Sequence, residues 1–320
     1  MFGPSHERTL MQQNNYAISL RLTADFQEAL QVSRAVLESG NRLLAENDWR
    51  VTLYRDNYAG NLRAIGRYAE ARDRLEGLVA TRRESAPDSF RTWRACTNLA
   101  AVLRLTGETQ RGHELAEEAY DQLTALLGPQ HPETIAAELE AACALWWLGE
   151  VETARKHAER VHDFFRDRRG AKHPYTLIAA ADLAMIERAN GNVTASRTRA
   201  EDAAAGLKAV LGPVHPHTLM AQASVATGRL RVGQIEEAYH LDLDVHRRLA
   251  GQLGDKHPTV VAAEVNLALS SRERRDGPQA RAELPRVQAR AAELLGQGHP
   301  YVSAAIEARR VDMDIALQPT

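Results

Sequence analysis

A histidine followed by a proline recurs at a fixed interval through most of this 320-residue chain. The histidines of five such pairs are spaced by 42 residues, and they are His131, His173, His215, His257 and His299. A fixed period of about 20–50 residues is the sequence signature of a solenoid, in which one supersecondary unit stacks on the next. The chain is therefore predicted to be a repeat protein.

Two further landmarks predict that each unit is a pair of helices. The turn positions between the helices are Ala24, Gly66, Gly107, Gly149, Gly191, Gly233 and Arg275, and the small residues five positions later are Ala29, Ala71, Gly112, Ala154, Ser196, Ala238 and Ala280. Glycine ends a helix because it accepts positive φ, and small residues allow helices to cross at about 8–10 Å. The resulting repeats are 6–47, 48–88, 89–130, 131–172, 173–214, 215–256 and 257–298.

We therefore predict an all-α fold, a right-handed superhelical solenoid of about seven helix pairs with a C-terminal capping helix at 299–314. The stretch Phe2–Leu10 is itself a copy of the loop motif, directly after Met1. A repeat array needs a polar capping element at its ends, and a loop motif is not one. The chain is therefore expected to be a fragment of a longer protein.

Composition excludes several classes of function. The net charge of −2 argues against a nucleic-acid-binding surface over the whole protein. No stretch approaches the roughly 18 consecutive apolar residues of a membrane span, and no secretory signal is visible, so we expect a cytoplasmic protein without membrane contact. Cys96 and Cys143 fall in different repeats and make no disulfide framework.

The repeat motifs also carry a resemblance to a known family. The loop Leu127–Ile135 has the pattern Leu-Gly-x-x-His-Pro-x-Thr-Ile, and it occurs with Asn98-Leu-Ala100 and with Gly-x-x-x-x-Ala at the turns. Together these resemble the 42-residue tetratricopeptide repeat of kinesin light chains. They also resemble the repeat arrays of actinobacterial NB-ARC-type signalling ATPases, including proteins of FxSxx-COOH peptide systems, whose C-terminal ends are similar to Arg309–Ile315. The resemblance implies a module that binds peptides or proteins and is not an enzyme.

A helical wheel locates the face of the first helices that is left for a ligand. At about 100° per residue, the Asn98-type position and the positions one before and six or seven after it fall within an arc of about 120°. The opposite side is mostly apolar and predicts the packing seam, while in a tetratricopeptide-like superhelix the arc lines the concave surface. The predicted ligand-binding residues on it are Asn15, Asn57, Asn98, Asn266, Arg21, Arg63, Arg104, Arg188, Arg272, Trp146 and Trp147.

These residue types suit an extended peptide, although each has a second interpretation. Asparagine amides match the alternating N–H and C=O of a peptide backbone, or they could bond the backbone of the next repeat. Arginines offer forked donors for an acidic residue or a free C-terminus, or they could be solvated helix residues. The tryptophans predict an anchor pocket for an apolar side chain, or one of them packs in the core.

Metal, cofactor and catalytic functions find no support in these motifs. Successive loop histidines are a whole repeat apart, on the order of 10 Å, whereas Zn–N bonds are about 2.0–2.1 Å. The His-Pro pairs are better interpreted as residues that fix the conformation of the loop. The sequence contains no phosphate-binding loop and no nucleophile elbow. We therefore predict recognition of an extended peptide or partner segment in the concave groove. The alternative is a regulatory sensor arm of an upstream NB-ARC-type ATPase in the same polypeptide.

Overall fold

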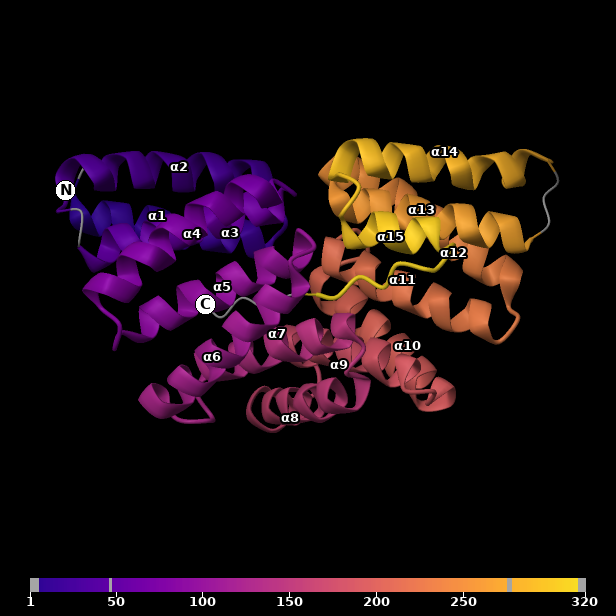
Figure 1. Cartoon of the computed structure of the whole chain (residues 1–320), viewed down its shortest axis with the longest axis horizontal. Helices are drawn as coiled ribbons and strands as arrows, with labels where there is room; N and C mark the ends of the chain where they lie inside the picture. The colour runs from indigo at the N-terminus through magenta and orange to yellow at the C-terminus, as the bar shows by residue number, and fades with distance from the viewer. Residues whose placement is uncertain (1–5, 46–47, 275–277, 316–320) are drawn as a thin grey trace. The chain divides into compact units, whose positions relative to one another are not determined.

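The computed structural model describes residues 6–45, 48–274 and 278–315, and this part of the chain is entirely helical apart from turns and loops (Figure 1). The predicted all-α fold is confirmed, because the described residues form fifteen α-helices and no strand. Three predictions lie outside the described residues. They are the first residues of the loop copy at 2–5, the turn position Arg275 and the side chain of Ala280.

The helices alternate as first and second members of pairs. The first helices are α1 (Glu7–Leu22), α3 (Trp49–Ala64), α5 (Phe90–Leu105), α7 (Pro132–Leu148), α9 (Pro174–Ala189), α11 (Pro216–Arg231) and α13 (Pro258–Glu273). The second helices are α2 (Phe26–Leu43), α4 (Tyr68–Ser85), α6 (Thr109–Leu127), α8 (Val151–Arg169), α10 (Val193–Leu211), α12 (Ile235–Leu253) and α14 (Pro278–Leu295). A last short helix, α15, covers Pro300–Ile306.

The loop histidines are the N-caps of the first helices. The Nδ1 atom of His173 accepts a hydrogen bond from the backbone N–H of Tyr175 at 3.2 Å. The same contact recurs at His6, His131, His215, His257 and His299. A proline follows each of these histidines except His6 and occupies the first helical position, where its missing N–H is not needed. The histidine–proline pair therefore locks the loop by satisfying one of the free N–H groups at the helix start.

The turn and small-residue landmarks lie where the sequence places them. Gly107 has a φ of 95°, and even Ala24, the one non-glycine turn residue in this part of the chain, has a φ of 66°. Gly112 stands where the second helix of its pair crosses the first. A Cβ atom added there would lie 2.9 Å from the carbonyl oxygen of Ala100, so only glycine fits without a shift.

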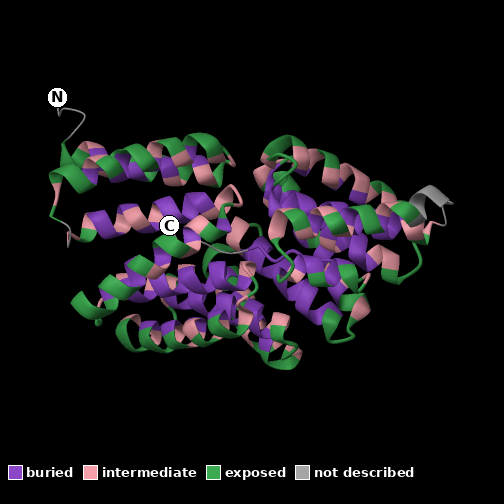
Figure 2. Ribbon diagram, turned by 45° about the horizontal axis from the view of Figure 1, so that its top comes forward, coloured by how far each residue is buried: buried purple, intermediate pink, exposed green. Residues whose placement is uncertain are grey.

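The chain divides into two compact units, residues 1–140 (unit 1) and 141–317 (unit 2), and the boundary falls inside α7. Within unit 1, the first helices α1, α3 and α5 contact one another in sequence, and within unit 2 the helices α9, α11 and α13 do the same. Of these helices, α5, α9 and α13 are buried along most of their length, whereas α1 and the second helices are buried on one stripe only (Figure 2). The ligand-facing side that the sequence predicts is therefore a property of the first helices.

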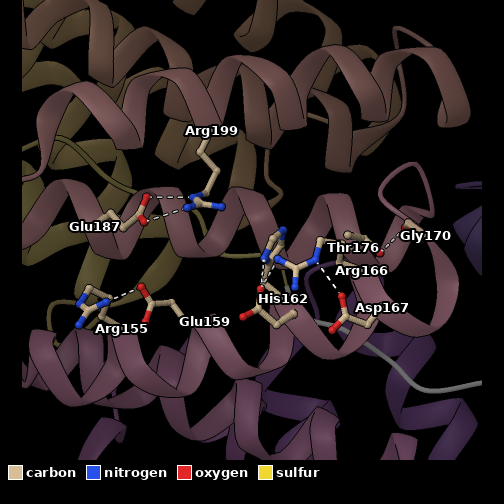
Figure 3. A network of polar contacts seen from close by, with 10 residues as sticks. Arg155, Glu159, His162, Arg166, Asp167, Gly170, Thr176, Glu187 and Arg199 are labelled. Atoms are coloured by element: carbon tan, nitrogen blue, oxygen red, sulfur yellow. Dashed lines mark hydrogen bonds and ion pairs between the residues drawn. The ribbon is translucent and has the colours of Figure 1, made fainter.

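Polar contacts tie the helices of unit 2 together at the packing seam (Figure 3). Glu187 of α9 lies on the side predicted to pack, and its carboxylate receives two hydrogen bonds from the guanidinium of Arg199 at 3.0 and 3.1 Å. The hydroxyl of Thr176 donates to the carbonyl oxygen of Gly170 at 2.9 Å and closes the loop before α9. The threonine of the loop motif therefore stabilises the loop in addition to the histidine.

The predicted capping helix at 299–314 is wrong in its length, because α15 ends at Ile306. Ala308 adopts a φ of 52°, and the next backbone N–H, of Arg309, donates to the carbonyl oxygen of Ala304 at 2.8 Å. A residue in the left-handed conformation after the last turn is a common helix stop. The residues that follow, Arg309–Ile315, form no helix and are called the C-terminal segment below.

The histidine caps predict a loss of stability in mild acid. Burial, with Arg169 nearby, lowers the pKa of His173 below its usual 6.5. As the pH falls below about 6.5, the unfolded chain binds a proton that the folded His173 resists, so the free energy of unfolding decreases. A cap contributes about 1 kcal/mol. Denaturation at pH 7.5 and 5.5 should show a smaller decrease for His173→Asn, which keeps a cap that does not titrate, and equal decreases would contradict this.

Candidate functional site

In unit 1, the predicted asparagine and arginine positions gather around one cavity. We call the side of the first helices that carries these positions the ladder face. The cavity has a volume of about 200 Å³ and is lined by Asn14, Asn15, Ile18, Arg21, Leu53, Asp56, Asn57, Gly60, Arg94 and Asn98. The structure thus brings together four predicted residues from α1, α3 and α5, namely Asn15, Arg21, Asn57 and Asn98.

The asparagine amides of unit 1 bond side chains of the preceding repeat. The Nδ2 atom of Asn57 donates to Oδ1 of Asn14 at 2.9 Å, and Nδ2 of Asn98 donates to Oδ1 of Asp56 at 2.8 Å. Neither acceptor was among the predicted site residues. Both stand one position before a ladder asparagine, within the same arc of the helical wheel, so the arc itself was the signal that could have found them.

Asp56 belongs to a charged cluster that sequence reasoning also missed. The Nε of Arg94 lies 3.0 Å from Oδ2 of Asp56, and its NH1 lies 3.6 Å from Oε1 of Glu133. Burial raises the pKa of Glu133 to about 7, although Arg94 acts in the opposite direction. One guanidinium therefore balances two carboxylates beside the cavity, and the charge of this cluster changes near neutral pH.

The arginines of unit 1 differ in their surroundings. Arg21 donates from NH1 to the carbonyl oxygen of Asn57 at 3.4 Å and to Oδ1 of Asn61 at 2.9 Å. Arg104 is buried, and its Nε and NH2 bond the two carboxylate oxygens of Glu140 at 2.6 and 3.0 Å. Arg63 is half-buried on α3 and does not line the cavity. Of the three, Arg21 is the one placed to meet a ligand.

In unit 2, the ladder face holds the C-terminal segment, which crosses α13 and α11 as an extended chain (yellow in Figure 1). Asn266 exchanges two hydrogen bonds with the backbone of Val311. Its Nδ2 donates to the Val311 carbonyl and its Oδ1 accepts from the Val311 N–H, both at 2.8 Å. Four residues further on, the N–H of Ile315 donates to Oδ1 of Asp182 at 2.8 Å. Asn266 and Asp182 occupy the same position in repeats seven and five.

Charged groups hold the polar side chains of the C-terminal segment. The guanidinium of Arg310 bonds both carboxylate oxygens of Asp242, at 2.7 and 2.8 Å, and Asp242 is 1% exposed. Asp312 pairs with the buried Arg188, which also donates to the carbonyl oxygen of Ser224 at 3.3 Å. A predicted ladder arginine therefore contacts an acidic residue of an extended chain.

Apolar side chains of the same segment are buried in alternation with the charged ones. Val311, Met313 and Ile315 are 1%, 6% and 1% exposed, a period of two that is typical of extended backbone. Trp147 packs against the cluster that contains Val311 and Met313, and its Nε1 lies 3.4 Å from Oδ1 of Asp314.

The remaining predicted residues of unit 2 do not contact the C-terminal segment directly in the same way. Trp146 packs against a different apolar cluster, formed by residues of α7, α8 and α9. Arg272 pairs with its neighbour Glu273 at 3.5 Å. Among the described residues, no group of three or more His, Cys, Asp or Glu side chains is placed to hold a metal ion. No described helix has the length and apolar character that crossing a membrane requires.

Comparisons with known proteins identify the repeat. Models of the tetratricopeptide repeat match residues 88–166 and 176–217. The tetratricopeptide-like repeats of a putative kinesin light chain from Podosopora anserina are 25% identical, with a TM-score of 0.50, and the match covers 65% of this chain and 98% of that one. No curated protein sequence matches significantly.

Two other solved structures show the same fold at low identity. NprR in complex with its cognate peptide NprX is 11% identical with a TM-score of 0.67, covering 94% of this chain and 84% of that one. A Rap protein complexed with the Competence and Sporulation Factor is 12% identical with a TM-score of 0.58, covering 95% and 100%. The repeat models, the helix pairs and these matches agree, and the chain has the fold of a tetratricopeptide-repeat array, with residues 88–166 and 176–217 matching the repeat itself.

Proposed function

We propose that this protein is a non-catalytic recognition module that binds an extended peptide or partner segment along the ladder faces of its first helices. The observation that carries the proposal is the pair of hydrogen bonds between the Asn266 amide and the backbone of Val311. They engage an N–H and a C=O of one residue, as neighbouring strands do, and do not depend on which side chain that residue has. Backbone contacts of this kind give affinity, while side-chain contacts give specificity.

Side-chain selectivity is proposed to come from the ladder arginines. The pairing of Arg188 with Asp312 supports an acidic residue, or the free C-terminal carboxylate of a ligand, as the group received there. A forked guanidinium suits either group, because both present two oxygens in one plane. NprR and Rap, which share the fold, were solved in complex with the cognate peptide NprX and with the Competence and Sporulation Factor, and this supports a peptide or protein partner here.

A direct test supplies the C-terminal segment in trans. The chain is truncated after Ala308, and a synthetic peptide with the sequence of Arg309–Ile315 is added. The peptide is expected to bind and to raise the melting temperature. Asn266→Ala should weaken binding about thirtyfold because two hydrogen bonds of about 1 kcal/mol each are lost. Arg272→Ala is the control, because Arg272 pairs with Glu273 instead.

A folded truncated chain that does not bind the peptide would contradict the proposal. If truncation unfolds the chain, hydrogen exchange on the full-length protein gives the answer. The Val311 amide should be protected, and Asn266→Ala should remove that protection while the amide of Leu284, in the core of unit 2, stays protected. An unprotected Val311 amide in the full-length protein would reject backbone binding by Asn266.

A further inference from the structure

We propose that the ladder face of unit 1 binds a partner peptide in which an acidic residue pairs with Arg21 and the residue before it pairs through its backbone with Asn98. The inference deepens the proposed function and rests on it. It assigns to unit 1 a direction, a register and a ligand chemistry, all taken from the way in which unit 2 holds the C-terminal segment.

The argument starts from the equivalence of α1, α3 and α5 with α9, α11 and α13. The residues at the equivalent positions four repeats further along the chain are Asp182 for Asn15, Arg188 for Arg21 and Asn266 for Asn98. The equivalence extends to side-chain contacts. Arg21 donates to the carbonyl oxygen of Asn57 at 3.4 Å, and Arg188 donates to that of the equivalent Ser224 at 3.3 Å. Both guanidinium groups are thus anchored at one end in the same way.

The contacts of the C-terminal segment then specify those of a ligand on unit 1. Asn266 bonds the backbone of Val311, Arg188 pairs with Asp312, and Asp182 accepts from the N–H of Ile315. The same contacts, transferred to the equivalent positions of unit 1, give the register of the ligand. Asn98 would bond the backbone of one ligand residue, Arg21 would pair with the next residue, and Asn15 would bond the fourth residue after the first. The ligand would run from repeat three toward repeat one and advance two residues per repeat.

Charge distinguishes the unit 1 ligand from the C-terminal segment. In unit 2, the carboxylate of Asp242 requires Arg310 as its partner. Asp242 stands four residues after the small residue Ala238. The equivalent position in unit 1, four residues after Ala71, is Leu75. The acidic Asp56 beside the cavity already has Arg94 as its partner. A ligand for unit 1 therefore needs the acidic residue and not the arginine.

The cavity in unit 1 offers matching surroundings for such a peptide. Leu53 and Ile18 give it an apolar part, and Leu53 is equivalent to Met220, which packs against the cluster that holds Val311. Asn14, which also lines the cavity, is 1% exposed, and its Nδ2 has no hydrogen-bond partner among the described residues. A ligand carbonyl oxygen that reaches Asn14 would accept a hydrogen bond from this otherwise unpaired Nδ2.

The test uses the full-length chain and two labelled peptides with blocked ends, Val-Asp-Met-Asp-Ile and Val-Asn-Met-Asp-Ile. Fluorescence anisotropy should show that the second peptide binds about tenfold more weakly, because a charge-assisted hydrogen bond is lost. Arg21→Met should weaken binding of the first peptide by the same factor and leave the second unchanged. Arg272→Met, a ladder arginine of unit 2 that pairs with Glu273, is the matched control and should have no effect.

The other outcomes separate this inference from the proposed function. Equal binding of the two peptides, abolished by Asn98→Ala, would retain backbone recognition and overturn the acidic preference. Loss of binding in Asn266→Ala but not in Asn98→Ala would place the peptide on unit 2 and overturn the unit 1 site. If neither peptide binds the wild-type chain, the unit 1 site is rejected, while the proposed function still stands on the C-terminal segment. The comparison of the two peptides needs no mutation, so a misfolded variant does not prevent a decision.

Discussion

Replacing Arg310 by alanine is expected to lower the free energy of unfolding by about 3–5 kcal/mol, the cost of leaving a buried charge without its partner. The carboxylate affected is that of Asp242, which is 1% exposed and bonded through both oxygens at 2.7 and 2.8 Å. The substitution also removes a bond of 2.9 Å to the hydroxyl of Thr227. Urea denaturation of the full-length chain measures the effect.

The adjacent arginine is a matched control for this experiment. Arg309 is exposed and pairs with the exposed Glu307, so Arg309→Ala should cost less than about 1 kcal/mol. The double variant Arg310→Met/Asp242→Leu should recover most of the lost stability, because a buried ion pair can be replaced by apolar residues at little cost. A loss below about 1 kcal/mol for Arg310→Ala would show that the C-terminal segment is not held in the described way.

A loss of similar size, about 3–5 kcal/mol, is expected for Arg104→Met in unit 1. Arg104 is 2% exposed and its partner Glu140 is 6% exposed, so the substitution leaves a carboxylate in a poorly solvated position. Thermal or urea denaturation should show the loss, and Arg104→Met/Glu140→Leu should restore most of it. A stable Arg104→Met chain would contradict the account.

This prediction also decides how Arg104 can be used in binding studies. A charge-reversed Arg104 would place two negative groups together in the interior of unit 1, so reduced binding would report misfolding and not ligand contact. Arg21, whose guanidinium lies at the cavity, is the informative arginine of unit 1. The two residues stand at the same position of their repeats, but Arg104 faces Glu140 and Arg21 faces Asn57 and Asn61.

The C-terminal segment shows where sequence reasoning failed and which signal it overlooked. Pro300, a good first helical residue, predicts that the stretch belongs to the capping helix. From Arg310 to Ile315, however, polar and apolar residues alternate strictly, a period of two that indicates extended backbone. The alternation covers only six residues, and the part of the chain that the structure describes has no strand that would pair with it. Its meaning depends on the ladder face on which it lies.

The tryptophans and arginines illustrate a similar limit. A helical wheel places Trp146 and Trp147 on the same arc, yet Trp146 packs in a cluster of α7, α8 and α9, while Trp147 contacts the C-terminal segment. The wheel likewise gives Arg21, Arg104 and Arg188 one position, and their partners are an amide, a buried carboxylate and the acidic Asp312. The position of a residue on a helix does not specify what the neighbouring elements place opposite it.

The sequence by itself determined the repeat length, the helix starts, the turns and the face of the first helices that carries the ladder residues. These features depend on local rules, since a histidine cap, a proline at the first helical position and a glycine at the turn act within a few residues. Only the tertiary structure decided which ladder residues are buried ion pairs, which line a cavity and which hold the chain's own C-terminal segment. Those outcomes depend on groups that are 36 to 133 residues apart, as in Arg104–Glu140 and Asp182–Ile315, and the 42-residue period says nothing about such pairings.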